Sequence, residues 1–149
     1  MKSENLNIVD TAIRSGFFQT FTRLLEGSQL ERKLRGKRSF TLFAPADIAF
    51  VGLPNEIFNQ LLRVESKGLL TDVLSYHVVP GKIMSAELKD RARFRSAFGE
   101  DLLVTNQDEV RIDGARLIQT DIEARNGVIH GIDRLLMPAK ATHSASATA

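Results

Sequence analysis

Histidines are the residues of this chain most suited to acid–base chemistry or metal binding. His77, His130 and His143 lie far apart in the sequence, and none has a partner at the local spacing of a zinc site. The chain has no cysteine, which excludes a thiolate metal site, a cysteine nucleophile and a disulfide. We therefore predict no metal and no cofactor. His77 and His130 are interpreted as core residues that hydrogen-bond to backbone carbonyls.

The motifs that bind phosphate or perform acyl transfer are missing. Gly36-Lys37 has Glu31 where a P-loop requires glycine, and Arg38 where it requires Ser or Thr. Neither a Rossmann glycine fingerprint nor a Gly-x-Ser-x-Gly elbow occurs. We predict that the chain is not an enzyme. An apolar pocket with converging polar groups would revive a hidden enzyme or a small-ligand carrier as an alternative.

Two clusters of basic residues could bind a polyanion such as a sulfated or acidic glycan. The first cluster comprises Arg32, Lys33, Arg35, Lys37 and Arg38. The second cluster, within residues 89–95, comprises Lys89, Arg91, Arg93 and Arg95. The alternative is a solvated helix end followed by a polar strand edge. Nucleic acid is not predicted, because the net charge is only +2 and no aromatic platform lies among these residues.

The composition is that of one compact domain. The chain has 149 residues, of which 43% are hydrophobic, and this is enough for one core. No apolar run approaches the roughly 20 residues that span a bilayer, and no secretory signal opens the chain, so the compartment is left open. Composition narrows to Ala, Ser and Thr near the end. We predict one domain over residues 5–139 and a disordered tail or linker over residues 140–149.

Hydrophobic spacing places helices mainly in the first half and strands mainly in the second, which favours an α+β fold. Short helices are expected to end at Gly16, Gly27 and Gly36, and further helices are expected over residues 57–62 and 69–77. A strand is expected over residues 40–44, and others over residues 102–105, 110–112, 115–118 and 128–132. Asp113-Gly114 predicts a type I′ hairpin between two of them.

Three blocks, in this order, resemble those of the fasciclin-like domain family. Thr41–Phe50 is similar to the family's first homology block, Tyr76–Gly81 to its Tyr-His segment, and Asn126–Pro138 to its second block. Asn7–Ala12 also looks like the family's opening helix. The resemblance covers about residues 5–139, so the chain is identified as a single fasciclin-like domain of the bacterial type.

The resemblance implies a helical N-terminal half packed on a wedge of two β-sheets from the second half. It also implies a non-enzymatic binding module for cell adhesion or for matrix and cell-surface interaction. Its partner would be a protein or a saccharide, and the module would be a monomer or self-associate weakly. The expected location is extracellular or in the cell envelope, with the cytoplasm as the alternative because no signal peptide is seen.

The resemblance also points to four candidate contact residues. In some family members the Tyr-His segment and an Asp-Ile pair are proposed to engage cell-surface receptors. The matching positions here are Tyr76, His77, Asp121 and Ile122. We expect Asp121 and Ile122 to be exposed contacts, and Tyr76 and His77 to shape that surface from beneath.

Overall fold

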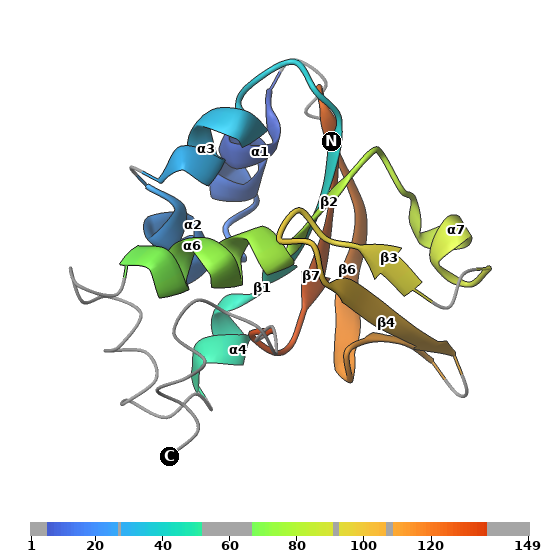
Figure 1. Ribbon diagram of the computed structural model, residues 1–149. Coiled ribbons are helices and arrows are strands. Elements are labelled where there is room, and N and C mark those ends of the chain that lie inside the picture. The colour runs from blue at the N-terminus through green and yellow to red at the C-terminus, as the bar shows by residue number, and fades with distance from the viewer. Residues whose placement is uncertain (1–5, 27, 52–66, 91–92, 107–108, 137–149) are drawn as a thin grey trace.

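The computed structural model describes residues 6–26, 28–51, 67–90, 93–106 and 109–136. Its helices are α1 (Ile8–Ser15), α2 (Gln19–Leu25), α3 (Gln29–Leu34), α4 (Asp47–Val51), α6 (Lys67–Tyr76) and α7 (Ser85–Leu88). Its strands are β1 (Phe40–Pro45), β2 (Val78–Pro80), β3 (Arg93–Arg95), β4 (Asp101–Asn106), β5 (Val110–Ile112), β6 (Ala115–Ala124) and β7 (Gly127–Ile132). Figure 1 shows α1, α2, α3 and α6 grouped on one side of β1 and β7. The α+β class is therefore confirmed.

Local capping explains where the first helices begin and end. The Asn7 side chain accepts a hydrogen bond from the Asp10 backbone at the start of α1, and Gly16 ends that helix in the left-handed conformation. The Ser28 hydroxyl accepts from the Glu31 backbone at the start of α3. The end of α1 at Gly16 agrees with the prediction, and α3 ends at Leu34, two residues before the predicted Gly36. The helix predicted over residues 57–62 lies outside the described residues, as do Gly27 and the predicted tail.

The seven strands form one hydrogen-bonded order, β2-β1-β7-β6-β5-β4-β3, in which only β1 and β7 are parallel. The two edges of this sheet meet, because the Ala97 N–H donates to the Val78 carbonyl at 2.6 Å. The predicted wedge thus consists of two halves of one curled sheet. β6 joins the halves: it pairs with β5 at its start and with β7 along the rest.

Two turns connect the strands around β6. Asp113 and Gly114 have φ angles of 50° and 86°, and they join β5 to β6 as the predicted type I′ hairpin requires. β6 extends to Ala124, well beyond the predicted strand over residues 115–118. The short edge strand β3 was not predicted as a separate element.

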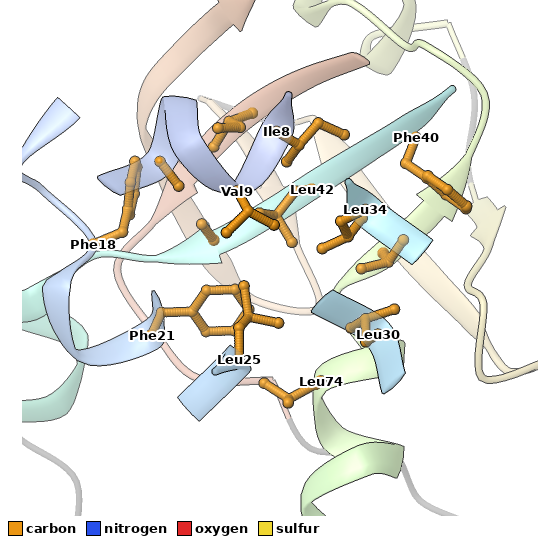
Figure 2. Packing of buried hydrophobic residues seen from close by; sticks show 14 of the residues in the cluster. Ile8, Val9, Phe18, Phe21, Leu25, Leu30, Leu34, Phe40, Leu42 and Leu74 are labelled. Atoms are coloured by element: carbon orange, nitrogen blue, oxygen red, sulfur yellow. The ribbon is translucent and has the colours of Figure 1, made fainter. Parts of the chain in front are cut away.

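The molecule has two hydrophobic cores, one on each face of β1. Leu42 faces the helices, where it joins Ile8, Phe18, Phe21, Leu25 and Leu74 among others (Figure 2). Phe43 points the other way, into a core between the two halves of the sheet that includes Phe94, Leu102, Ile112 and Ile132. All residues of β1 are buried, and Leu42 and Phe43 enter different cores because successive side chains of a strand point to opposite faces. Among the described residues no helix is long and apolar enough to cross a membrane.

Candidate functional site

Tyr76 ties α6 to the β5–β6 hairpin. Its side chain is only 5% exposed, and its hydroxyl donates to the Asp113 carboxylate and lies 3.3 Å from the Asp101 carbonyl oxygen. Burial, followed by the hydrogen bond to Asp113 and the nearby carboxylates, raises the pKa of Tyr76. An open cavity of about 600 Å³, which Glu100 and Arg134 also line, reaches this residue. Tyr76 is therefore a structural link between α6 and the β5–β6 hairpin.

His77 lies in the core with both ring nitrogens hydrogen-bonded to the backbone. Nδ1–H donates to the Val73 carbonyl at 2.7 Å, and Nε2 accepts from the Leu136 N–H at 2.9 Å. Burial lowers its pKa to about 4, although the Val73 carbonyl acts in the opposite direction. The ring packs against Phe21, with centroids 5.6 Å apart. The interpretation of His77 as a core residue is confirmed.

His130 has the opposite tautomer but a similar role. Its Nδ1 accepts from the Asp121 N–H at 3.1 Å, so Nε2–H donates to the Ile83 carbonyl at 2.8 Å. Burial lowers its pKa, against the effects of the Ile83 carbonyl and the Asp121 charge. Its ring packs on Phe43. Within the described residues, no three acidic or histidine side chains are grouped so that they could hold a metal ion.

Asp121 holds the start of α7. Its carboxylate accepts from both the Ser85 N–H at 2.8 Å and the Ser85 hydroxyl at 2.6 Å. Partial burial raises the pKa of Asp121, but the two Ser85 hydrogen bonds and nearby His130 outweigh this effect and lower it. The residue has a φ of 56°, in the left-handed region. Sequence reasoning missed Ser85, because no local pattern connects residues 36 positions apart.

Ile122 is less exposed than expected. It is partly buried against the core beneath the helices, and it pairs with Ile129 of β7. Tyr76 and His77 lie next to β2, which is three strands away from β6, or about 14 Å at the usual strand spacing. The structure therefore does not bring the four candidate residues into one site. Asp121 contacts His130 instead of His77.

The ladder between β6 and β7 is irregular around Asp121. Its register shifts between Leu117 and Gln119 and again between Gln119 and Ile122. We call residues 118–122 the β6 bulge segment. Its Ile118 side chain is 43% exposed, and Leu103 of β4 is the other exposed large apolar side chain in the described strands, at 52%. Bulges re-aim side chains and are common beside functional sites.

The first basic cluster divides into paired and unpaired residues. Arg35 forms ion pairs with Asp10 at 2.9 Å and Glu31 at 3.3 Å. The remaining members, Arg32, Lys33, Lys37 and Arg38, are exposed and form no ion pair with any described residue. Three of these, Lys33, Lys37 and Arg38, line a cavity of about 450 Å³ together with Leu30, Gly36, Phe40, Pro80 and Ala97.

In the second basic cluster, two arginines form ion pairs with the same carboxylate. Arg93 and Arg95 lie 3.6 and 3.5 Å from Asp101, and both remain exposed. Lys89 is exposed as well, and Arg91 lies outside the described residues. This cluster thus offers less uncompensated charge than its sequence indicates.

Asn126 is a further residue whose role the sequence did not reveal. It is 5% exposed, and its Oδ1 accepts from the Ile8 N–H at 3.0 Å. Its Nδ2 donates to the carbonyls of Leu34 at 2.7 Å and Gly36 at 3.1 Å, and lies 3.4 Å from that of Arg38. One side chain thereby fixes both the start of α1 and the loop that carries Lys37 and Arg38.

Comparison with solved structures identifies the architecture. The chain is similar to the FAS1 domain pair of the insect cell adhesion molecule Fasciclin I, with a TM-score of 0.74 over 91% of this chain and 52% of that one. The identity is 17%, so this likeness concerns the fold alone. The fasciclin-like fold expected from the sequence is confirmed.

Comparison with known sequences points to the same family as the fold does. The chain is 37% identical to "Protein sll1483" of Synechocystis over 134 residues, covering 89% of this chain and 74% of that protein. It is 30% identical to human periostin over 125 residues, which is 82% of this chain but only 15% of periostin. The family model for the fasciclin domain matches residues 16–138. This chain belongs to the fasciclin domain family.

Proposed function

We propose that the chain is a non-enzymatic binding module that contacts another protein in cell adhesion or at a cell surface or matrix. The observation that carries the proposal is the β6 bulge segment, where Ile118 is exposed and the partly exposed Asp121 is held in place by Ser85. An exposed apolar side chain and a fixed carboxylate on the same strand segment offer a partner both burial and a directed hydrogen bond. Membership of the fasciclin domain family supports the adhesion role.

The state of the histidines supports binding over catalysis. Both ring nitrogens of His77 and of His130 are engaged by backbone groups, and both rings are buried. A general base needs a lone pair that can reach substrate, and neither ring offers one. The role of the domain would then lie in surface complementarity, with Tyr76 and His77 stabilising the fold away from that surface.

The proposed location is extracellular or in the cell envelope. Adhesion to a cell surface or matrix requires the partner to be accessible there, and membership of the fasciclin domain family supports the same compartment. The first test is retention of the purified chain on cells or envelope extract from its source, at low and then at high salt. Retention through high salt, with none for the denatured chain, is expected. Release by salt would instead favour a purely electrostatic contact.

Substitutions at the β6 bulge segment test where the partner binds. Ile118→Ser should weaken retention by about tenfold or more, since an anchoring apolar side chain contributes more than 1 kcal/mol to binding. Leu103→Ser is the matched control, because Leu103 is also a strand residue and is 52% exposed. Equal loss in both variants, or no loss in either, would place the contact elsewhere.

A test of Asp121 as a partner contact must separate that contact from its hydrogen bonds to Ser85 at the start of α7. Asp121→Asn removes the charge, whereas Ser85→Ala removes one of the two hydrogen bonds and leaves the charge. Loss of retention in Asp121→Asn but not in Ser85→Ala is expected if the carboxylate itself contacts the partner. Similar losses in both variants would reduce Asp121 to a residue that positions α7.

Polyanion binding is a second candidate function, because one group of cations is exposed and has no ion-pair partner among the described residues. Arg32, Lys33, Lys37 and Arg38 form a group of exposed cations without described ion-pair partners. Arg35 is expected to contribute least to polyanion binding, because Asp10 and Glu31 already neutralise its side chain. Binding to a sulfated polysaccharide that falls steeply with salt, and that Lys37→Glu abolishes, would support this candidate.

A further inference from the structure

A cavity of about 450 Å³ lies between α3, the loop after it, and the meeting edges of the curled sheet. Leu30 and Phe40 form its floor, and both are almost fully buried. Pro80 at the end of β2 and Ala97 just after β3 form the opposite wall, and both are exposed. The volume falls within the range of small-molecule sites.

The rim of this cavity is strongly positive. Lys33, Lys37 and Arg38 line it, and no Asp or Glu is among its lining residues. None of the three cations forms an ion pair with a described residue, whereas neighbouring Arg35 is engaged by Asp10 and Glu31. The aliphatic stems of the two lysines can extend the apolar wall while their charged ends stay at the mouth.

The loop that carries two of these cations is fixed in position. Asn126 donates to the carbonyls of Leu34 and Gly36, and the Gly36 N–H bonds to the Lys33 carbonyl at 3.1 Å. The Gly81 N–H also bonds to the Ser39 carbonyl at 2.8 Å, which holds β2 against the end of the loop. A ligand therefore meets a preformed loop backbone and has to order only the charged side chains.

We propose that this cavity binds a small amphipathic anion, a carboxylate with an unbranched apolar tail. The carboxylate would lie between Lys37 and Arg38 at the mouth, where charge-assisted hydrogen bonds are available. The tail would cover the apolar lining that Phe40, Pro80 and Ala97 provide. This site is separate from the β6 bulge segment and does not depend on the partner contact proposed there.

The apolar floor favours an amphipathic ligand over an extended polyanion. A polysaccharide would contact the cations but would leave the surface of Phe40, Pro80 and Ala97 without an apolar partner. Inorganic anions would likewise use only the rim. Both charge and tail should therefore contribute to affinity, and each can be removed separately from the ligand.

Titration of the full chain with octanoate, followed by NMR of the backbone amides, tests the proposal. Saturable shifts are expected at Gly36, Lys37, Arg38 and Ala97, with a dissociation constant at least about tenfold lower than for acetate or for 1-octanol. Dextran sulfate is titrated in parallel. Strong, salt-sensitive binding of dextran sulfate with no shifts from octanoate would overturn the proposal in favour of a polyanion surface.

Two double variants and one single variant locate the ligand. Lys37→Gln combined with Arg38→Gln should weaken octanoate binding by about tenfold or more, since each removes a charged donor. Lys89→Gln combined with Arg93→Gln makes the same change in net charge elsewhere and should leave binding unchanged. Ala97→Leu, at an exposed position, should fill the cavity and also weaken binding. Equal effects of both charge pairs, or none from Ala97→Leu, would overturn the assigned site.

Discussion

Asn126 is the residue whose single side chain connects the most distant parts of the chain. It bonds Ile8 across 118 positions and Leu34 across 92. We expect Asn126→Ala to lower the free energy of unfolding by about 3 kcal/mol, because it leaves several buried backbone groups without partners. Urea denaturation followed by circular dichroism measures the loss.

Two variants sharpen this test. Asn126→Asp keeps an acceptor for the Ile8 N–H but cannot donate to the Leu34 and Gly36 carbonyls, so it should also destabilise the fold. Asn106→Ala, at an exposed position at the end of β4, should change stability by less than about 0.5 kcal/mol. Similar effects at Asn126 and Asn106 would contradict the role assigned to the amide.

His77 gives the domain a defined dependence on pH. Its pKa is about 4 in the folded protein against 6.5 for the ordinary side chain, so between these values the unfolded chain binds more protons. Stability should be fully present above pH 6.5 and should fall as the pH drops toward 4, by roughly 3 kcal/mol from this group. Urea midpoints measured from pH 7.5 to 4 follow the change.

The matched variant for this prediction is His77→Gln. It does not titrate, yet it can still donate toward Val73 and accept from Leu136, the two partners of the imidazole. The difference in pH dependence between the two proteins isolates His77 from His130, whose pKa is also lowered. An unchanged slope in the variant would show that His77 contributes little.

The sequence predicted the type of environment at single residues better than it predicted their partners. The wide spacing of His77 and His130 indicated core residues, and both are buried and bonded to backbone carbonyls. The pairing of Asp121 with Ser85 could not be predicted, because it depends on how α7 packs beside β6. The same holds for Asn126, which the sequence identified only as the first residue of the block Asn126–Pro138.

At the scale of elements, the parallel contact between β1 and β7 is sensitive to one glycine. A Cβ atom at Gly127 would lie 1.9 Å from the Phe40 carbonyl oxygen and 2.7 Å from the Ile8 side chain. Gly127→Ala must therefore push β7 away from β1, and we expect it to destabilise the domain by about 3 kcal/mol or more. Chemical denaturation provides the measurement.

Gly81→Ala is the control, because it separates backbone strain from crowding. Gly81 has a φ of 97°, but nothing lies within 4 Å of the added Cβ. It should lower stability by only about 1–2 kcal/mol, the usual penalty for a left-handed conformation. If both variants lost the same stability, the close approach of β1 and β7 would not be the cause.

Elements with local signals were predicted, and elements defined by distant contacts were not. Asp113-Gly114 specified the hairpin before β6, and Gly16 specified the end of α1. The later part of β6 carries no clean alternation, because its ladder with β7 shifts register on both sides of Gln119. Asp121 and Ile122 lie in this part, which is why their exposure could not be judged from sequence.

At the scale of the whole molecule, closure of the sheet and formation of the second core are one event. The Ala97 N–H reaches the Val78 carbonyl only when the β3–β4 half folds over the β1–β7 half. That folding also buries Phe43 between the halves. Such contacts depend on chain segments far apart in the sequence, so composition predicted one core where the structure has two.

A single small module presents only a limited surface to a partner, so avidity should decide whether it adheres strongly. Joining two full chains through a flexible linker of about 20 residues, which spans roughly 25 Å on average, makes the second contact intramolecular. On a surface that carries many copies of the partner, we expect retention to rise by about 100-fold over the single chain. Dissociation from immobilised envelope extract measures the gain.

The decisive control is a linked protein in which the second copy carries both Ile118→Ser and Asp121→Asn. This protein has the same size and linker but only one intact β6 bulge segment, so it should dissociate like the single chain. If it were retained as strongly as the intact pair, the gain would come from another surface and the β6 bulge segment would not be the contact. If linking two intact copies gave no gain, adhesion through many weak contacts would be contradicted, because accessible paired sites necessarily slow release.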